Sequence, residues 1–130
     1  MYQWITGNAH ALIVTLNDNN ITLNQNAASY FNDVRYCLIG IDPKTLKVAI
    51  KPVSKADIES NRVVLDQLHK ISLGKGYAKI SNKAVCDYLA SLIHKPLHGI
   101  KLMAHFNDVE KMLEFDLNTI LEKGEETWIR

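Results

Sequence analysis

The sequence predicts an α+β fold in which the order strand, turn, strand, short helix, hairpin occurs twice. Two pairs of similar segments support this prediction. The segment "SLGKGYAKISNKAVCDYL" (72–89) echoes "NNITLNQNAASYF" (19–31), and a hairpin pattern over 100–117 echoes one over 36–53. Identity between the copies is low, so chance similarity stays open as the alternative explanation.

The first copy begins with a predicted strand over 12–16, where β-branched residues are frequent. The polar segment 17–20, "NDNN", predicts a turn, because Asn and Asp tolerate left-handed backbone. A short strand over 21–23 follows. The side chain of Asn24 can then cap a short helix over 25–31.

The segment 36–53 predicts two strands joined by a tight turn. Asp42 and Pro43 suit the first and second positions of a type I turn. Apolar and polar residues alternate after the turn, as on a half-buried strand. Pro52 should mark the end of that strand or an exposed edge, because it lacks an N–H donor.

A polar connector is predicted over 54–62. The following segment 63–71 leaves two interpretations open, since Val63 to Leu65 fits a strand whereas Leu65, Leu68 and His69 fit a helix.

The second copy is expected to start at a turn containing Gly74 and Gly76, followed by a strand over 78–80. Ser81 should take the capping role of Asn24, ahead of a helix over 82–93. With Ala84 set over Ala27, the two copies are offset by 57 residues. The later hairpins are offset by 65 residues, because the second copy has a longer helix that ends at Pro96 and Gly99.

Length and composition favour one globular domain. The chain has 130 residues, of which 47% are apolar and 22% charged. No apolar run reaches the roughly 18 residues that a membrane helix needs. No signal peptide is recognisable, so a cytoplasmic location is expected. The predicted organisation is a single domain over 1–130, with repeat 1 at about 9–53, the connector at about 54–62, repeat 2 at about 63–117 and an acidic tail at 118–130.

Charge is unevenly distributed although the formal net charge is only +1. The segment 70–83 contains four lysines and no acid, whereas 108–126 contains seven acids and two lysines. A solvated surface of mixed charge is the simpler interpretation. The sharper interpretation is that the lysine segment contacts phosphate groups while the acidic segment faces away.

No catalytic or metal site is predicted, and no cofactor. Cys37 and Cys86 lack metal-ligand spacing and are interpreted as reduced core thiols. His94, His98 and His105 have Pro96 among them, which disfavours a regular helix presenting two metal ligands.

We also expected no acid/base pair among the carboxylates. Glu114 and Asp116, on one predicted strand, were assigned to opposite faces.

The order of elements resembles the swapped-hairpin module of the SpoVT/AbrB-like superfamily. "LGKGYAKIS" (73–81) and "NKAVCDYL" (82–89) stand where that family has its loop, second strand and helix. "IGIDPKTLKVAIKP" (39–52) is similar to its terminal hairpin. The resemblance covers about 11–117 and implies two tandem modules that interleave into one small barrel-like domain.

The resemblance also implies a function, because many members of the superfamily bind DNA as regulators. The family's loop arginine corresponds to Asn20 in the first copy and Tyr77 in the second, so that feature is missing. Arg62 and Lys44 could contribute, but the sequence does not place them. The leading hypothesis is a small non-catalytic regulatory protein that binds double-stranded DNA through phosphate contacts from Lys70, Lys75, Lys79 and Lys83. The alternative is a protein-interaction or assembly module, with a protein partner or a second copy of the chain as its ligand, and no membrane contact.

Overall fold

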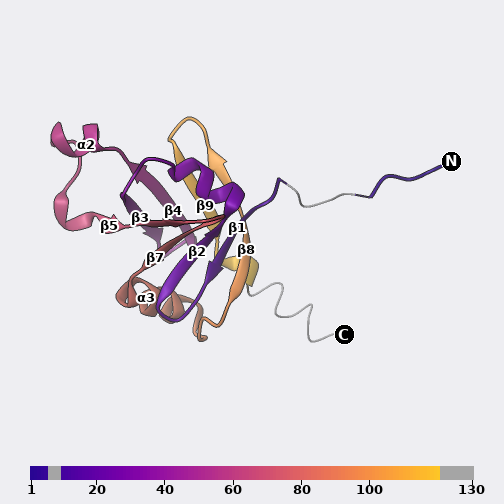
Figure 1. Ribbon diagram of the computed structural model, residues 1–130. Helices are drawn as coiled ribbons and strands as arrows, with labels where there is room; N and C mark the ends of the chain where they lie inside the picture. The colour runs from indigo at the N-terminus through magenta and orange to yellow at the C-terminus, as the bar shows by residue number, and fades with distance from the viewer. Residues whose placement is uncertain (6–9, 121–130) are drawn as a thin grey trace.

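The computed structural model describes residues 1–5 and 10–120. Within them the fold is α+β, with mostly antiparallel strands in one nearly closed, barrel-like sheet and few helices (Figure 1). The strands are β1 (Leu12–Leu16), β2 (Asn20–Asn24), β3 (Tyr36–Asp42), β4 (Lys47–Val53), β5 (His69–Lys70), β6 (Ser72–Gly74), β7 (Tyr77–Ser81), β8 (Ile100–Asn107) and β9 (Met112–Asp116).

Hydrogen bonds join the nine strands in the order β5-β3-β4-β9-β8-β1-β2-β7-β6. The two ends of this order are nearly continuous in the chain, because only Ile71 separates β5 from β6. The N–H of Ile71 donates to the carbonyl of Arg35 over 2.9 Å, which extends the β3–β5 pairing by one bond. One piece of chain therefore pairs with β3 at its start and with β7 at its end, and this brings the sheet almost to closure.

The core lies inside the curved sheet. Alternate residues of each strand point inward, as in β2, where Ile21 and Leu23 are buried between partly exposed polar neighbours. The largest fully buried side chains come from both halves of the chain, and they are Phe31, Leu16, Ile21, Leu23, Ile50, Ile80, Leu89, Leu97, Leu102, Leu113, Leu117 and Val14. The two halves of the chain therefore share one hydrophobic core.

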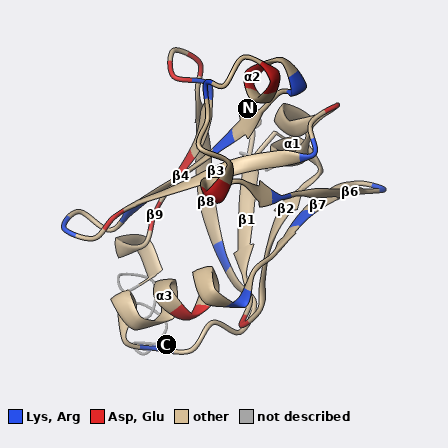
Figure 2. Ribbon diagram, turned by 90° about the vertical axis from the view of Figure 1, so that its left-hand side faces the viewer, with Lys and Arg blue, Asp and Glu red and all other residues tan. Residues whose placement is uncertain are grey.

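Two helical segments lie toward opposite ends of the sheet (Figures 1 and 2). The first consists of α1 (Gln25–Ala28) and the 3₁₀ turn η1 (Ser29–Phe31). As predicted, Asn24 is its N-cap and accepts the N–H of Ala27 over 3.0 Å.

The second helix is α3 (Lys83–Ile93), and the prediction of its cap was wrong. Its N-cap is Asn82, whose side chain accepts the N–H of Val85, whereas Ser81 is the last residue of β7. The strand runs one residue further than expected, because Ser81 pairs with Asn20 of β2. The helix ends at His94, which has left-handed backbone with φ of 56°.

The connector predicted over 54–62 contains a short helix, α2 (Lys55–Glu59). Ser54 and Asp57 form a reciprocal capping box at its start, a local signal that the sequence interpretation missed. The ambiguous segment 63–71 is neither one helix nor one strand. It contains the 3₁₀ turn η2 (Leu65–Gln67) and then β5.

The predicted turn between β3 and β4 is present. Oδ1 of Asp42 accepts the N–H groups of Lys44 and Thr45, which fixes the turn. Pro52 lies one residue before the end of β4, beyond the part of this strand that pairs with β9.

Candidate nucleic-acid interface

A row of lysine and hydroxyl side chains crosses five strands on the outer surface of the barrel. The register pairs Lys101 with Thr15, Thr15 with Thr22, Thr22 with Lys79 and Lys79 with Ser72. These positions alternate with buried core residues, so their side chains point away from the core. Three strand spacings separate Lys79 from Lys101, which corresponds to about 14 Å.

Lys70 adds to this outer surface. Ile71 is buried, so its neighbours Lys70 and Ser72 point outward. Lys70 pairs with Tyr36 of β3, which is also exposed. Lys70 therefore extends the row of Lys79 and Ser72 around the barrel toward β3.

Lys75 lies at the tip of the β6–β7 hairpin, in the turn between Gly74 and Tyr77. The other turn residue, Gly76, has a φ of 83°, which is favourable for glycine and strained for other residues. Lys75, Tyr77 and Lys79 are all exposed and follow one another along this hairpin.

The strands beneath these lysines contain no acidic residue. Neither Asp nor Glu occurs in β1, β2, β5, β6, β7 or β8. Acids occur instead in β3 and β9, at Asp42, Glu114 and Asp116. Figure 2 shows red segments on β9 and blue ones along β7 and the hairpin tip of β6. We call the outward surface formed by Lys70, Lys75, Lys79, Lys101, Thr15, Thr22, Ser72 and Tyr77 the basic face.

The structure separates Lys83 from the other three predicted lysines. Its Nζ lies 3.1 Å from Oδ1 of Asp87, one turn later on α3. Asp18 and Asp87 both raise the pKa of Cys86, after the larger effect of its burial, so two carboxylates lie near the start of α3. The positive charge of Lys83 is therefore offset locally.

Sequence reasoning missed Lys101, because it was sought within one run of lysines. The signal was available in the alternation of β8, where Lys101 and Met103 stand between the buried Leu102 and its inward-facing neighbours. The two further cations considered lie elsewhere. Lys44 is in the turn between β3 and β4, and Arg62 lies 3.9 Å from Asp57 beyond α2.

The two thiols are buried and free, as the sequence predicted. Burial raises the pKa of Cys37 to about 12, and burial followed by Asp87 and Asp18 raises the pKa of Cys86. Both sulfurs are therefore protonated at neutral pH.

Histidines and carboxylates form no metal-like cluster of three or more in the described part of the chain. His94 follows α3, whereas Nε2 of His105 lies 3.1 Å from Oε1 of Glu114 across the β8–β9 pair. The assignment of Glu114 and Asp116 to opposite faces was wrong. Residues two apart on a strand share a face, and both side chains border a hollow on the outer surface with Lys47.

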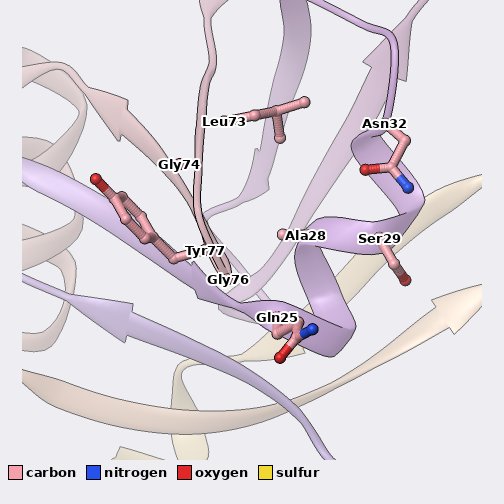
Figure 3. Close-up of a pocket in the computed structure, with 8 residues that line it drawn as sticks. All are labelled: Gln25, Ala28, Ser29, Asn32, Leu73, Gly74, Gly76 and Tyr77. Atoms are coloured by element: carbon pink, nitrogen blue, oxygen red, sulfur yellow. The ribbon is translucent and has the colours of Figure 1, made fainter.

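A hollow of about 240 Å³ lies between α1 and the β6–β7 hairpin (Figure 3). Leu73 faces this side of the hairpin, whereas the ring of Tyr77 points to the other side, away from α1 (Figure 3). The hollow is therefore separate from the basic face.

Comparison with family models, curated proteins and solved structures finds no match to this chain. No helix in residues 1–5 and 10–120 is long and apolar enough to cross a membrane.

Proposed function

We propose that this chain is a small non-catalytic regulatory protein that binds DNA through the basic face. The observation that supports this function best is the gathering of Lys70, Lys75, Lys79 and Lys101 over strands that contain no acid. A nearly neutral chain thus presents one cationic surface, although its net charge is only +1.

Phosphate contacts are the chemistry that this surface suits. Lysine ammonium groups neutralise phosphates and release counterions, which supplies most sequence-independent affinity for DNA. The hydroxyls of Thr15, Thr22 and Ser72 stand between the lysines and can donate hydrogen bonds to phosphate oxygens. No residue type here is matched to one particular base, so we propose backbone contacts without strong sequence preference.

We further propose that the fold consists of two tandem AbrB-like repeats. The strand registers support this. Residues offset by 57 pair with one another at Thr22 and Lys79, and the neighbouring pairs, Ile21 with Ile80 and Leu23 with Ala78, exchange under the same offset. Such self-consistent pairing is what a twofold relation between β2 and β7 produces.

The second offset behaves in the same way. Ala49 pairs with Glu114, which lies 65 residues later, and the flanking pairs Val48–Phe115 and Ile50–Leu113 exchange under that offset. Both offsets come from the sequence comparison alone, so their agreement with the registers supports the repeat. The proposal also explains why the halves share one core, because a module of about 50 residues buries little surface by itself.

A protein-interaction module is the second candidate function. It is favoured by the outer surface of β4 and β9, where charges of both signs stand side by side, as in the pair of Lys47 with Asp116. The absence of loop arginines at Asn20 and Tyr77 also favours it.

A salt-dependent titration tests the DNA proposal. Anisotropy of a labelled mixed-sequence duplex is measured at about 50 and about 200 mM salt, a range over which phosphate-binding proteins lose much affinity. We expect Lys75→Glu with Lys79→Glu to weaken binding and reduce the slope of log K against log salt by about 2. The matched control is Lys44→Glu with Lys55→Glu, which makes the same charge change away from the basic face.

Absence of duplex binding at low salt would favour the interaction module. Equal losses in the two double variants would mean that net charge, rather than the basic face, determines affinity.

A further inference from the structure

Tyr77 occupies a particular place on the basic face. It alternates with the buried Ala78 and Ile80 along β7, so its side chain points outward with that of Lys79. It pairs across the hairpin with Gly74. Its ring lies in the space that a Cβ on Gly74 would fill, because such a Cβ would stand 2.3 Å from both Cε1 and Cζ of the ring.

The ring is held against the hairpin and is still accessible. Tyr77 is 44% exposed, and its hydroxyl makes no hydrogen bond with any described residue. Gly74 has no side chain, so nothing from its position covers the ring. An aromatic ring that lies against the backbone loses little conformational freedom when a ligand stacks on it.

Cations flank this ring along the chain. Lys75 precedes it by two residues and Lys79 follows it by two, which places them about 7 Å away along an extended strand. A second exposed tyrosine, Tyr36, pairs with Lys70 at the edge of the same face. The basic face therefore alternates ammonium groups with exposed aromatic rings.

We infer that the basic face binds single-stranded nucleic acid, with one unpaired base stacked on Tyr77 and the adjoining phosphates contacting Lys75 and Lys79. Stacked bases of a duplex present no free face to such a ring, whereas those of a single strand do. This inference rests on the proposed phosphate binding and names the form of nucleic acid that the site prefers. Stacking requires only an aromatic face, so it adds affinity with little sequence preference.

Three probes of equal length test the inference with the complete chain. They are labelled oligothymidylate, an abasic strand with the same phosphates, and a mixed-sequence duplex. We expect oligothymidylate to bind roughly tenfold more tightly than the abasic strand, within the range that one base stacked on an aromatic ring contributes. We also expect it to bind more tightly than the duplex.

Variants at Tyr77 separate the ring from the phosphate contacts. Tyr77→Leu should remove the preference for oligothymidylate over the abasic strand, while Tyr77→Phe should keep it. Tyr88→Leu is the matched control, because Tyr88 is 46% exposed but lies on α3, outside the basic face. It should change neither affinity.

Gly74→Ala displaces the ring without removing it. Gly74 does not have positive φ, so alanine introduces no backbone strain there, and its Cβ contacts only the movable end of the tyrosine. We expect the preference for oligothymidylate to fall in this variant while binding of the abasic strand stays the same.

The failure of this inference differs from that of the proposed function. Equal salt-dependent binding of all three probes, unchanged in Tyr77→Leu, would overturn base stacking and leave phosphate binding in place. No binding of any probe at low salt would overturn both.

Discussion

The side-chain amide of Asn82 joins the start of α3 to His69 on β5. Its Oδ1 accepts the N–H of Val85 over 3.1 Å, and its Nδ2 lies 3.1 Å from Nδ1 of His69. Because Oδ1 is used as the helix cap, Nδ2 is the donor, and Nδ1 of His69 must be an unprotonated acceptor. The imidazole is therefore held neutral, with its proton on Nε2.

This arrangement predicts a loss of stability in mild acid. Burial lowers the pKa of His69 below the ordinary value of about 6.5. The unfolded chain therefore binds a proton at this residue before the folded chain does, and the free energy of unfolding rises with pH across that interval. The contribution is complete above about pH 6.5 and is lost as the pH falls toward the folded pKa.

Urea unfolding between pH 7 and pH 5 measures this effect. His69→Gln should reduce the pH dependence over this interval, while His98→Gln, at an exposed loop position, should leave it as in the wild type. An undiminished dependence in His69→Gln would assign the effect to other groups.

Replacing Asn82 should destabilise the protein through its capping oxygen. We expect Asn82→Ala to lower the free energy of unfolding by about 1 kcal/mol, the typical cost of a lost N-cap. Asn82→Ser keeps a capping oxygen and should lose less, although it removes the amide that reaches His69. Thermal or urea unfolding at pH 7 compares the two, and equal losses would argue against a capping contribution.

Lys101 and Lys83 should differ in their contribution to DNA affinity. Lys101→Gln should weaken duplex binding and reduce the salt slope by about 1, because Lys101 lies in the same outer row as Lys79. Lys83→Gln should have little effect, because Asp87 offsets its charge. The same salt titration checks both variants. A larger loss from Lys83→Gln would return the site to the segment predicted from the sequence.

Asp87→Asn provides the opposite change at the same place. It leaves Lys83 without its carboxylate partner and should strengthen DNA binding modestly, if phosphates approach the start of α3. A reduced affinity would contradict the assignment of Asp87 as an opposing charge.

The two thiols should be inert in the folded protein. Burial raises the pKa of both Cys37 and Cys86, so almost no thiolate exists at pH 8. A disulfide reagent should label neither cysteine in the native state and both in denaturant, with mass spectrometry as the readout. Rapid native labelling of Cys86 would mean that α3 opens locally.

Local signals in the sequence predicted much of the secondary structure. The alternation within β2 and β7, the acceptor at Asn24 and the turn at Asp42 each act over a few residues, so they can be recognised without the fold. The errors occurred where neighbours decide. Ser81 belongs to β7 rather than to the cap, because its pairing with Asn20 extends that strand.

The candidate site was only partly predictable. Lys70, Lys75 and Lys79 are close in sequence, and their alternation on exposed strand positions places them on one surface. Lys101 lies on β8, and only the pairing of β8 with β1 brings it into the row of Lys79. The offset of Lys83 by Asp87 was available one helical turn away, but a count of lysines overlooked it.

The sequence by itself determined the strands, the caps and the repeated order of elements, because these depend on periodicity and on hydrogen bonds between near neighbours. The tertiary structure alone decided the sheet order, the near closure at Ile71 and the company of each lysine. Those features arise from pairing between residues far apart in the chain, such as Thr15 with Lys101, and no local pattern specifies which distant strand will be the partner.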